Sequence, residues 1–230
     1  IPVPSYDRIG KPGAEFYPLP KDSRVFGEVK PDNSLGNTNW GGRLSRLIGG
    51  WDLSAFYYRS LDVAQTFYVT GFNGLQPEFQ PRHDRISQTG GTLAKDFGAF
   101  VLKGEVVHTR GRKFNLTDPT AAPFGLVAQD TIDYVVGADI PAFNDGRVNL
   151  QYFARRMLDY DSRTGVERTE GGASILLNTK LARSWEGEAL YVGMLNRTDY
   201  MFRPKLIWSA SRNWRVAFGV DIFGGSPSGL

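Results

Sequence analysis

Apolar and polar side chains alternate along the last part of the chain with the period of a β-strand. Over residues 213–223, the residues on one face would be Trp214, Val216, Phe218, Val220 and Ile222. The segment before it, residues 202–210, alternates in the same way, and residues 211–213 are left as the turn. The pattern predicts a long antiparallel hairpin with an aromatic-tipped apolar face and an opposite face that carries charges.

The same alternation recurs upstream and predicts about ten strands. They are expected at residues 39–48, 51–58, 85–95, 99–109, 130–140, 147–156, 172–183, 186–196, 202–210 and 213–223. Gly49 and Gly50 separate the first two strands and supply the positive φ angles that a type I′ turn requires. A transmembrane strand takes roughly 9–11 tilted residues, against about 5–6 for an ordinary strand. The strand length therefore favours a membrane barrel over a soluble sandwich.

The connections between these strands alternate in length. Turns after the odd-numbered strands are tight, whereas long connections occur at residues 61–84, 110–129 and 159–170. Outer-membrane barrels have short periplasmic turns and longer extracellular loops. The predicted fold is therefore all-β: an antiparallel up-and-down transmembrane β-barrel portion over residues 39–230. An irregular loop or arm is predicted for residues 1–38, with room for a short strand at residues 25–29.

Composition narrows the function classes. The chain has no cysteine, which excludes disulfide scaffolds and thiolate metal sites. No stretch approaches the roughly 20 apolar residues of a spanning helix, so a helical membrane protein is not expected. The net charge of +3 is spread without a basic cluster, and no nucleic-acid partner is expected.

Two motifs carry a resemblance to a known class of protein. They are WGGRLSRLIGGWDLSAFYY, at residues 40–58, and NWRVAFGVDIFGG, at residues 213–225. Together with the alternation of turns and loops, they resemble Gram-negative outer-membrane β-barrels, in particular an uncharacterised porin-like family. The resemblance implies a bacterial outer-membrane location, contact with lipid and passage of small solutes. Because such barrels end in a strand with a terminal aromatic residue, we expect a C-terminal portion that lacks its closing strand, with any signal peptide upstream.

On the barrel interpretation, the charged residues opposite the apolar rows point into the lumen. The predicted lumen and selectivity residues are Asp52, Lys103, Glu105, Asp133, Asp139, Arg155, Lys180, Arg203, Lys205, Arg215 and Asp221. Two roles are open to them. In a wet channel, opposed charges create a transverse field that selects solutes. Alternatively, the same residues form salt-bridged ladders between strands and fill a narrow interior.

Catalytic motifs are not found in the sequence. It has no Gly-x-Ser-x-Gly elbow, P-loop or His-Glu-x-x-His motif, so no enzyme activity, cofactor or metal is predicted. His83 precedes Asp84 in a predicted loop, and we expect it to be solvated or at the rim rather than an acid–base couple. His108 is expected at an interface or in the lumen, near the outer end of its strand. The acidic residues at 159–170 do not have the spacing of a calcium loop.

These observations support one leading hypothesis and three alternatives. The leading one is an outer-membrane channel or transporter for passive passage of small solutes, some of them hydrophobic. Its apolar segment at residues 63–69 would be either a constriction or an entrance patch. The first alternative is a structural or docking barrel, in contact with an envelope protein or further copies through loops 61–84 and 110–129. The others are an outer-membrane lipase or protease and a soluble ligand-binding barrel.

Overall fold

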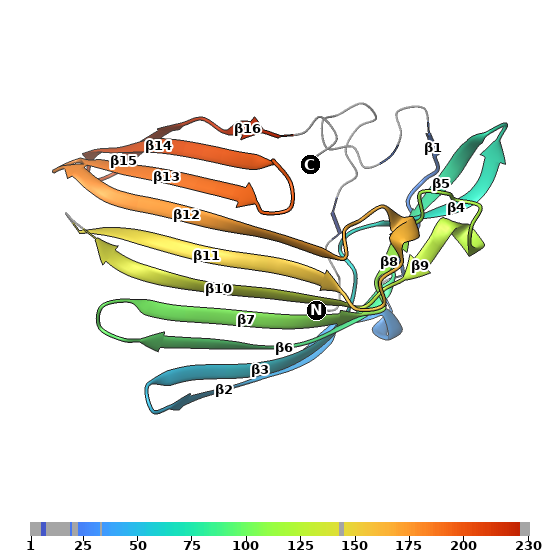
Figure 1. Ribbon diagram of the computed structural model, residues 1–230, viewed down its shortest axis with the longest axis horizontal. Coiled ribbons are helices and arrows are strands. Elements are labelled where there is room, and N and C mark those ends of the chain that lie inside the picture. The colour runs from blue at the N-terminus through green and yellow to red at the C-terminus, as the bar shows by residue number, and fades with distance from the viewer. Residues whose placement is uncertain (1–5, 8–18, 20–22, 33, 143–144, 226–230) are drawn as a thin grey trace.

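The computed structural model describes residues 6–7, 19, 23–32, 34–142 and 145–225. One large antiparallel sheet of eleven strands dominates it, and neighbouring strands follow one another along the chain (Figure 1). In spatial order these are β2 (Trp40–Ile48), β3 (Trp51–Leu61), β6 (Arg85–Asp96), β7 (Val101–Arg110), β10 (Thr131–Ala142), β11 (Gly146–Met157), β12 (Thr169–Ala182), β13 (Trp185–Met194), β14 (Tyr200–Ser211) and β15 (Trp214–Gly219). The short strand β16 (Ile222–Gly224) pairs with β14 beyond the end of β15.

The strand pattern read from the sequence is largely confirmed. An all-β chain with a large antiparallel sheet is observed, and most strand boundaries lie within two or three residues of the prediction. Gly49 and Gly50 have φ angles of 56° and 79°, as the tight turn between β2 and β3 requires. The turn between β10 and β11 contains residues 143–144, and the predicted terminal loop includes residues 226–230; both lie outside the described residues.

Closure into a barrel is not observed. Within the described residues, β2 and β15 form the two edges of the sheet and do not pair with each other. All nine residues of β2 are exposed. The sheet therefore presents backbone N–H and C=O groups along both edges instead of joining them in a cylinder.

The predicted last strand, residues 213–223, is divided in two. Continuing the register of β14 and β15 places Pro204 opposite Val220, and Val220 N–H donates to the Pro204 carbonyl at 3.3 Å. Proline has no N–H to return the second hydrogen bond of that pair. The ladder is interrupted at residues 220–221 and resumes with β16.

The long connections contain structure that the sequence did not predict. Residues 62–84 hold the hairpin of β4 (Thr66–Asn73) and β5 (Gln76–Arg82), and residues 111–130 hold β8 (Lys113–Asn115) and β9 (Leu126–Ala128). Three short 3-10 helices lie nearby: η1 (Leu35–Asn37), η2 (Pro123–Gly125) and η3 (Ser162–Thr164). We call residues 62–84, 111–130 and 158–168 the loop module. It lies beyond one end of the large sheet, opposite the tight turns (Figure 1).

The predicted arm, residues 1–38, lies partly outside the described residues. Within it, β1 (Arg24–Val25) pairs in parallel with β5, and Val29 forms an isolated bridge with Arg82. These contacts attach the described part of the arm to the loop module. No helix among the described residues combines the length and apolar character needed to cross a bilayer.

Candidate functional site

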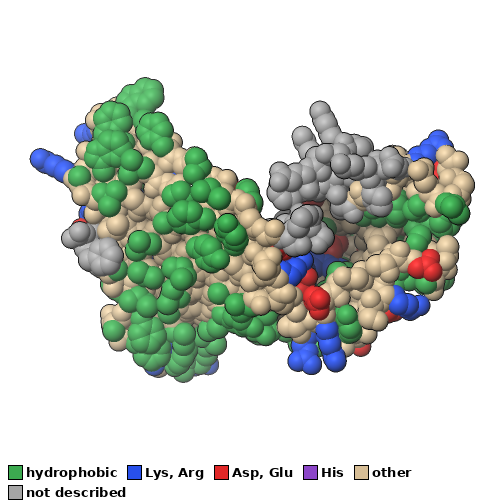
Figure 2. All heavy atoms as spheres, turned by 45° about the horizontal axis from the view of Figure 1, so that its top comes forward, with side chains coloured by type: hydrophobic (Ala, Val, Ile, Leu, Met, Phe, Trp, Pro, Cys, Tyr) green, Lys and Arg blue, Asp and Glu red, His purple; other side chains and the backbone are tan. Residues whose placement is uncertain are grey.

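One face of the large sheet is apolar and exposed. Because directly paired residues project to the same face, the register assigns Leu150 and Ile175 to one side of neighbouring strands, and both are more than a third exposed. The face continues from Leu53 and Leu93 on one side to Leu206 and Phe218 on the other. Figure 2 shows hydrophobic side chains gathered over the sheet, whereas charged side chains cluster at the loop module.

Aromatic side chains lie towards both ends of the strands on this apolar face. Near the tight turns, the rings of Trp185 and Trp208 stack 5.6 Å apart. Six residues along β13, Tyr191 lies 5.9 Å from Tyr200 of β14. At about 3.3 Å per residue, this places the two levels roughly 20 Å apart along the strand. Exposed aliphatic residues bounded by two aromatic levels are the arrangement expected for a strand surface in contact with lipid.

The opposite face of the sheet is polar. The register brings ten of the eleven predicted lumen residues to this face, and the contact with Arg203 places Asp221 there as well. Asp133, for example, lies directly opposite Arg155, and Lys103 is level with Gly137 of the next strand. The structure therefore brings this set together as one surface. Its role in selecting solutes stays a prediction.

Most charges on the polar face are paired between strands. Nine of the eleven residues form ion pairs: Lys103 with Asp139, Asp133 with Arg155, Arg203 with Asp221, Lys180 with Asp145, Lys205 with Glu188 and Arg215 with Glu186. Their N–O distances run from 2.5 Å for Lys103–Asp139 to 3.5 Å for Lys205–Glu188. These contacts are ladders of ion pairs between strands, which is one of the two roles considered for these residues from the sequence.

Asp52 and Glu105 differ from the other nine. Neither forms an ion pair with a residue that the structure describes, although both line a shallow hollow on the polar face. The hollow also contains Thr92 and Gln151. Lys103 also lines this hollow, and Arg43 Nη2 donates to Thr92 Oγ1 at 3.3 Å, so positively charged side chains lie beside the two carboxylates.

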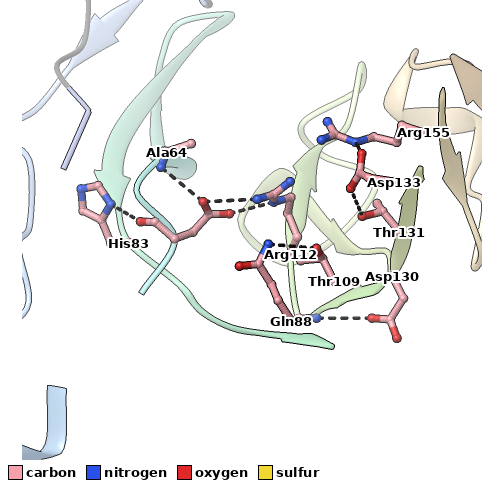
Figure 3. A network of polar contacts seen from close by, with 11 residues as sticks. Ala64, His83, Gln88, Thr109, Arg112, Asp130, Thr131, Asp133 and Arg155 are labelled. Atoms are coloured by element: carbon pink, nitrogen blue, oxygen red, sulfur yellow. Dashed lines mark hydrogen bonds and ion pairs between the residues drawn. The ribbon is translucent and has the colours of Figure 1, made fainter. Parts of the chain in front are cut away.

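A polar network joins the large sheet to the loop module (Figure 3). Asp62, directly after β3, is 5% exposed, and its carboxylate accepts from Arg112 Nε at 2.8 Å and Nη2 at 3.4 Å. Ala64 N–H also donates to this carboxylate, at 3.3 Å. At the adjacent strand ends, Thr109 and Thr131 are fully buried. The network fixes the connection 62–84 against the connection 111–130.

His83 is buried, which corrects the expectation of a solvated loop residue. Its Nδ1 lies 2.7 Å from the backbone oxygen of Asp62, and its Nε2 lies 2.7 Å from Glu28 Oε1. Burial acts to raise the pKa of Glu28, but hydrogen bonds from His83, Lys30 and Gln65 outweigh it and hold the pKa below 4.5. His83 thus ties the arm to the loop module.

Asp84 belongs to a second, partly buried cluster instead of pairing with the adjacent His83. Its Oδ1 accepts from Tyr68 Oη at 2.6 Å and from Lys113 Nζ at 2.8 Å. Lys113 Nζ also donates to Tyr68 Oη, at 2.5 Å. Burial acts to raise the pKa of Asp84, and the hydrogen bonds from Lys113, Tyr68 and Thr66 lower it below 3.8. The charge of Lys113 is therefore balanced inside the protein.

The remaining predicted candidates lie apart from one another. His108 is on the apolar face, at the loop-module end of β7, with Nε2 3.7 Å from Asp130. Asp161 binds Arg163, whose side-chain and backbone donors lower the pKa of Asp161 to about 2. Glu170 pairs with Arg197 at 3.2 Å. Among the residues described, no group of three His, Asp or Glu side chains is placed to hold a metal ion.

The apolar segment at residues 63–69 runs into β4, which begins at Thr66. Phe67 and Val69 are buried and form a small core with Phe79 of β5. This packing places Phe67 and Val69 inside the loop module, and the role of the segment as a constriction or an entrance patch stays a prediction. Val63, at the start of the segment, is about half exposed.

Sequence reasoning missed Asp62, Tyr68, Arg112 and Lys113. Their partners are 16 to 50 residues away along the chain, and each residue alone reads as an ordinary loop or strand residue. A pattern with a period of two residues carries no signal for such contacts.

No protein-family model, curated protein or solved structure matches this chain.

Proposed function

We propose that this chain forms part of the wall of a bacterial outer-membrane β-barrel through which small solutes pass passively. The observation that carries the proposal is the division of one sheet into an exposed, aromatic-bounded apolar face and an ion-paired polar face. Insertion into a bilayer removes the apolar face from water, which is favourable by about 25 cal/mol for each Å² of apolar surface. In a soluble protein, a surface of this size would have to be covered by another layer.

The two open edges set a condition on this barrel. Neighbouring strands alternate in direction, so β2 and β15, first and tenth in the order, are antiparallel to each other. An antiparallel barrel can therefore form in two ways. Either β2 and β15 pair directly, or an even number of further strands lies between them. Closure is required because the bilayer core offers no partner for unpaired backbone groups. A single added strand would instead be parallel to one of its neighbours.

The polar face suggests where selectivity arises. Paired residues such as Arg203 and Asp221 largely cancel each other's field at a distance, whereas Asp52 and Glu105 have no ion partner among the described residues. In a wet lumen bounded by this face, Asp52 and Glu105 would be the carboxylates best placed to meet a passing cation. Of the eleven predicted lumen residues, we therefore propose Asp52 and Glu105 as the main selectivity residues.

The decisive experiment is conductance of the full-length, detergent-purified protein in a planar lipid bilayer. Discrete ohmic steps with a preference for K⁺ over Cl⁻ support the proposal, and the double variant Asp52→Asn with Glu105→Gln should reduce that preference. The matched control is Asp96→Asn, which removes one carboxylate at the tight-turn end of β6. A protein that inserts into the bilayer without conducting ions would contradict the proposed channel function.

A structural barrel without transport is the second candidate. The observation favouring it is the extent of pairing on the polar face, because cross-strand ion pairs stabilise and fill an interior as well as they line a pore. The folded hairpin β4–β5 offers a contact surface at its tip, where Leu75 is 98% exposed. Co-purification of a stoichiometric envelope protein or formation of a defined homo-oligomer would support this role, and loss of that contact in Leu75→Ser would locate it.

A further inference from the structure

Three arginines lie on the apolar face at the ends of strands that run towards the loop module. Arg59 is near the end of β3, Arg110 is the last residue of β7, and Arg156 is near the end of β11. Arg59 and Arg156 follow Leu53 and Leu150 of the apolar face by an even number of residues, so they share that face. The register across β6 places Arg110 on the same face as Arg59. We call these three residues the arginine row.

The arginine row has a surplus of positive charge. Arg110 pairs with Asp130 at 3.3 Å, although its side chain is still 70% exposed. Arg59 and Arg156 are exposed, and neither forms an ion pair with a residue that the structure describes. In the described strands of the large sheet, the register places no Asp or Glu on the apolar face. The surplus charge therefore rests on Arg59 and Arg156.

Aromatic side chains of the apolar face come just before both ends of the row. Arg59 is two residues beyond Tyr57, whose ring lies 5.4 Å from that of Trp40. Arg156 is four residues beyond Tyr152, whose ring lies 6.0 Å from a tyrosine of β10. Aromatic rings on membrane strands lie at the level of the lipid headgroups. Arginines at this end can cover apolar surface with their aliphatic stems and extend their guanidinium groups into the charged headgroup region.

The spacing of the row favours a lipid surface over a single small anion. Neighbouring strands lie about 4.8 Å apart, and one strand separates β3 from β7 and another separates β7 from β11. The backbones of successive arginines are therefore separated by roughly 10 Å across the sheet. Such a row presents separate charges to several headgroups and does not enclose one ion in a pocket.

We infer that the arginine row binds the phosphate groups of anionic lipid headgroups at the loop-module end of the sheet. A guanidinium group donates two parallel N–H bonds to phosphate oxygens, and basic side chains at a membrane surface attract anionic lipids. The inference rests on the proposed contact of the apolar face with lipid. It goes beyond that contact by naming the lipid class and the residues that recognise it.

The test is native mass spectrometry of the full chain released from detergent micelles that contain equal amounts of two lipids. Phosphatidylglycerol is anionic, and phosphatidylcholine is zwitterionic. We expect each chain to retain about fivefold more phosphatidylglycerol than phosphatidylcholine. A higher salt concentration during incubation should weaken this preference, because salt screens exposed charges. Equal retention of the two lipids, or a preference that salt does not change, would overturn the inference.

Variants locate the contact. Arg59→Gln with Arg156→Gln should bring the retention ratio close to one, because it removes the surplus charge. The charge-matched control is Arg43→Gln with Arg147→Gln, since both of these arginines are exposed and the register places them on the polar face. Equal losses of preference in the two double variants would contradict the assignment to the apolar face.

Lipid retention and conductance are separate measurements. A silent bilayer recording with the preference for phosphatidylglycerol intact would contradict the channel and support the lipid contact. A conducting protein that retains both lipids equally would keep the channel and overturn this inference.

Discussion

Arg112 binds the buried carboxylate of Asp62 through two donors, although the two residues are 50 positions apart in the chain. The pair holds together two of the three connections that form the loop module, 62–84 and 111–130. Its electrostatic value depends on burial, since the side chain of Asp62 is 7% exposed and that of Arg112 is 23% exposed. Removal of either partner would leave an uncompensated charge in a poorly hydrated place.

Arg112→Met should therefore destabilise the loop module by about 3 kcal/mol. The measurement is amide hydrogen exchange of β4 and β8 in the purified protein, where protection should fall while β10 and β11 keep theirs. Lys180→Met is the control, because its ion pair with Asp145 is exposed and should contribute little to stability. Unchanged exchange in Arg112→Met would show that this pair does not hold the module.

Acid should loosen the same region. The pKa values of Asp84 and Glu28 are below the ordinary values of 3.8 and 4.5, so each carboxylate contributes stability that is present above its ordinary value. That contribution is lost as the pH falls through the lowered pKa of the folded state. Exchange protection in β4 and β8, corrected for intrinsic rates, should therefore fall below about pH 4. Asp84→Asn should show a smaller acid-induced change than the parent protein.

Contact of the apolar face with lipid is tested by two neighbouring positions on β11. Leu150 lies on the apolar face, and Gln151 lies on the polar face. Arginine on a lipid-facing strand costs about 2–4 kcal/mol near the middle of the bilayer. Leu150→Arg should therefore reduce the fraction of protein that inserts into liposomes from urea, whereas Gln151→Arg should insert normally. Equal insertion of both variants would contradict contact between the apolar face and lipid.

Charge reversal within one ion pair tests the polar face as a lumen. Arg203 Nε lies 2.5 Å from Asp221 Oδ1, and both side chains are about 43% exposed. Arg203→Glu should shift the reversal potential of the conducting protein towards cation preference, and Lys205→Glu should act in the same direction. Exchange of the pair, Arg203→Asp with Asp221→Arg, should restore most of the parental selectivity. A conducting protein with unchanged selectivity in both Arg203→Glu and Lys205→Glu would exclude these residues from the lumen.

Pro204 should weaken the last pairing of the sheet. Replacement by valine supplies the N–H that is missing opposite Val220, and one hydrogen bond contributes about 1 kcal/mol. Amide exchange in β15 and β16 should slow by roughly fivefold at that energy. Leu206→Val, two residues along the same face, adds no donor and is the control. Faster exchange in Pro204→Val would indicate that the ring contributes more through packing than it costs in pairing.

The sequence by itself determined the strands, the tight turns and the two faces of the large sheet. This is because the alternation of side chains along a strand is a local property. The apolar face of one strand can be identified from its own residues, such as Ile132, Tyr134 and Val136, without information from any other part of the chain. The same locality placed all eleven predicted lumen residues on one surface, since antiparallel pairing through short turns preserves the alternation from strand to strand.

Tertiary structure alone decided the loop module, the open edges and the partners of the buried charges. His83 was misread because its neighbour Asp84 turns to Tyr68 and Lys113, while the ring itself meets Glu28, 55 residues earlier in the chain. Contacts of this kind depend on how long connections fold back over the sheet, and no short-range period encodes them. Whether an edge finds a partner is likewise set by the assembly of strands, whereas each strand's own pattern specifies only its faces.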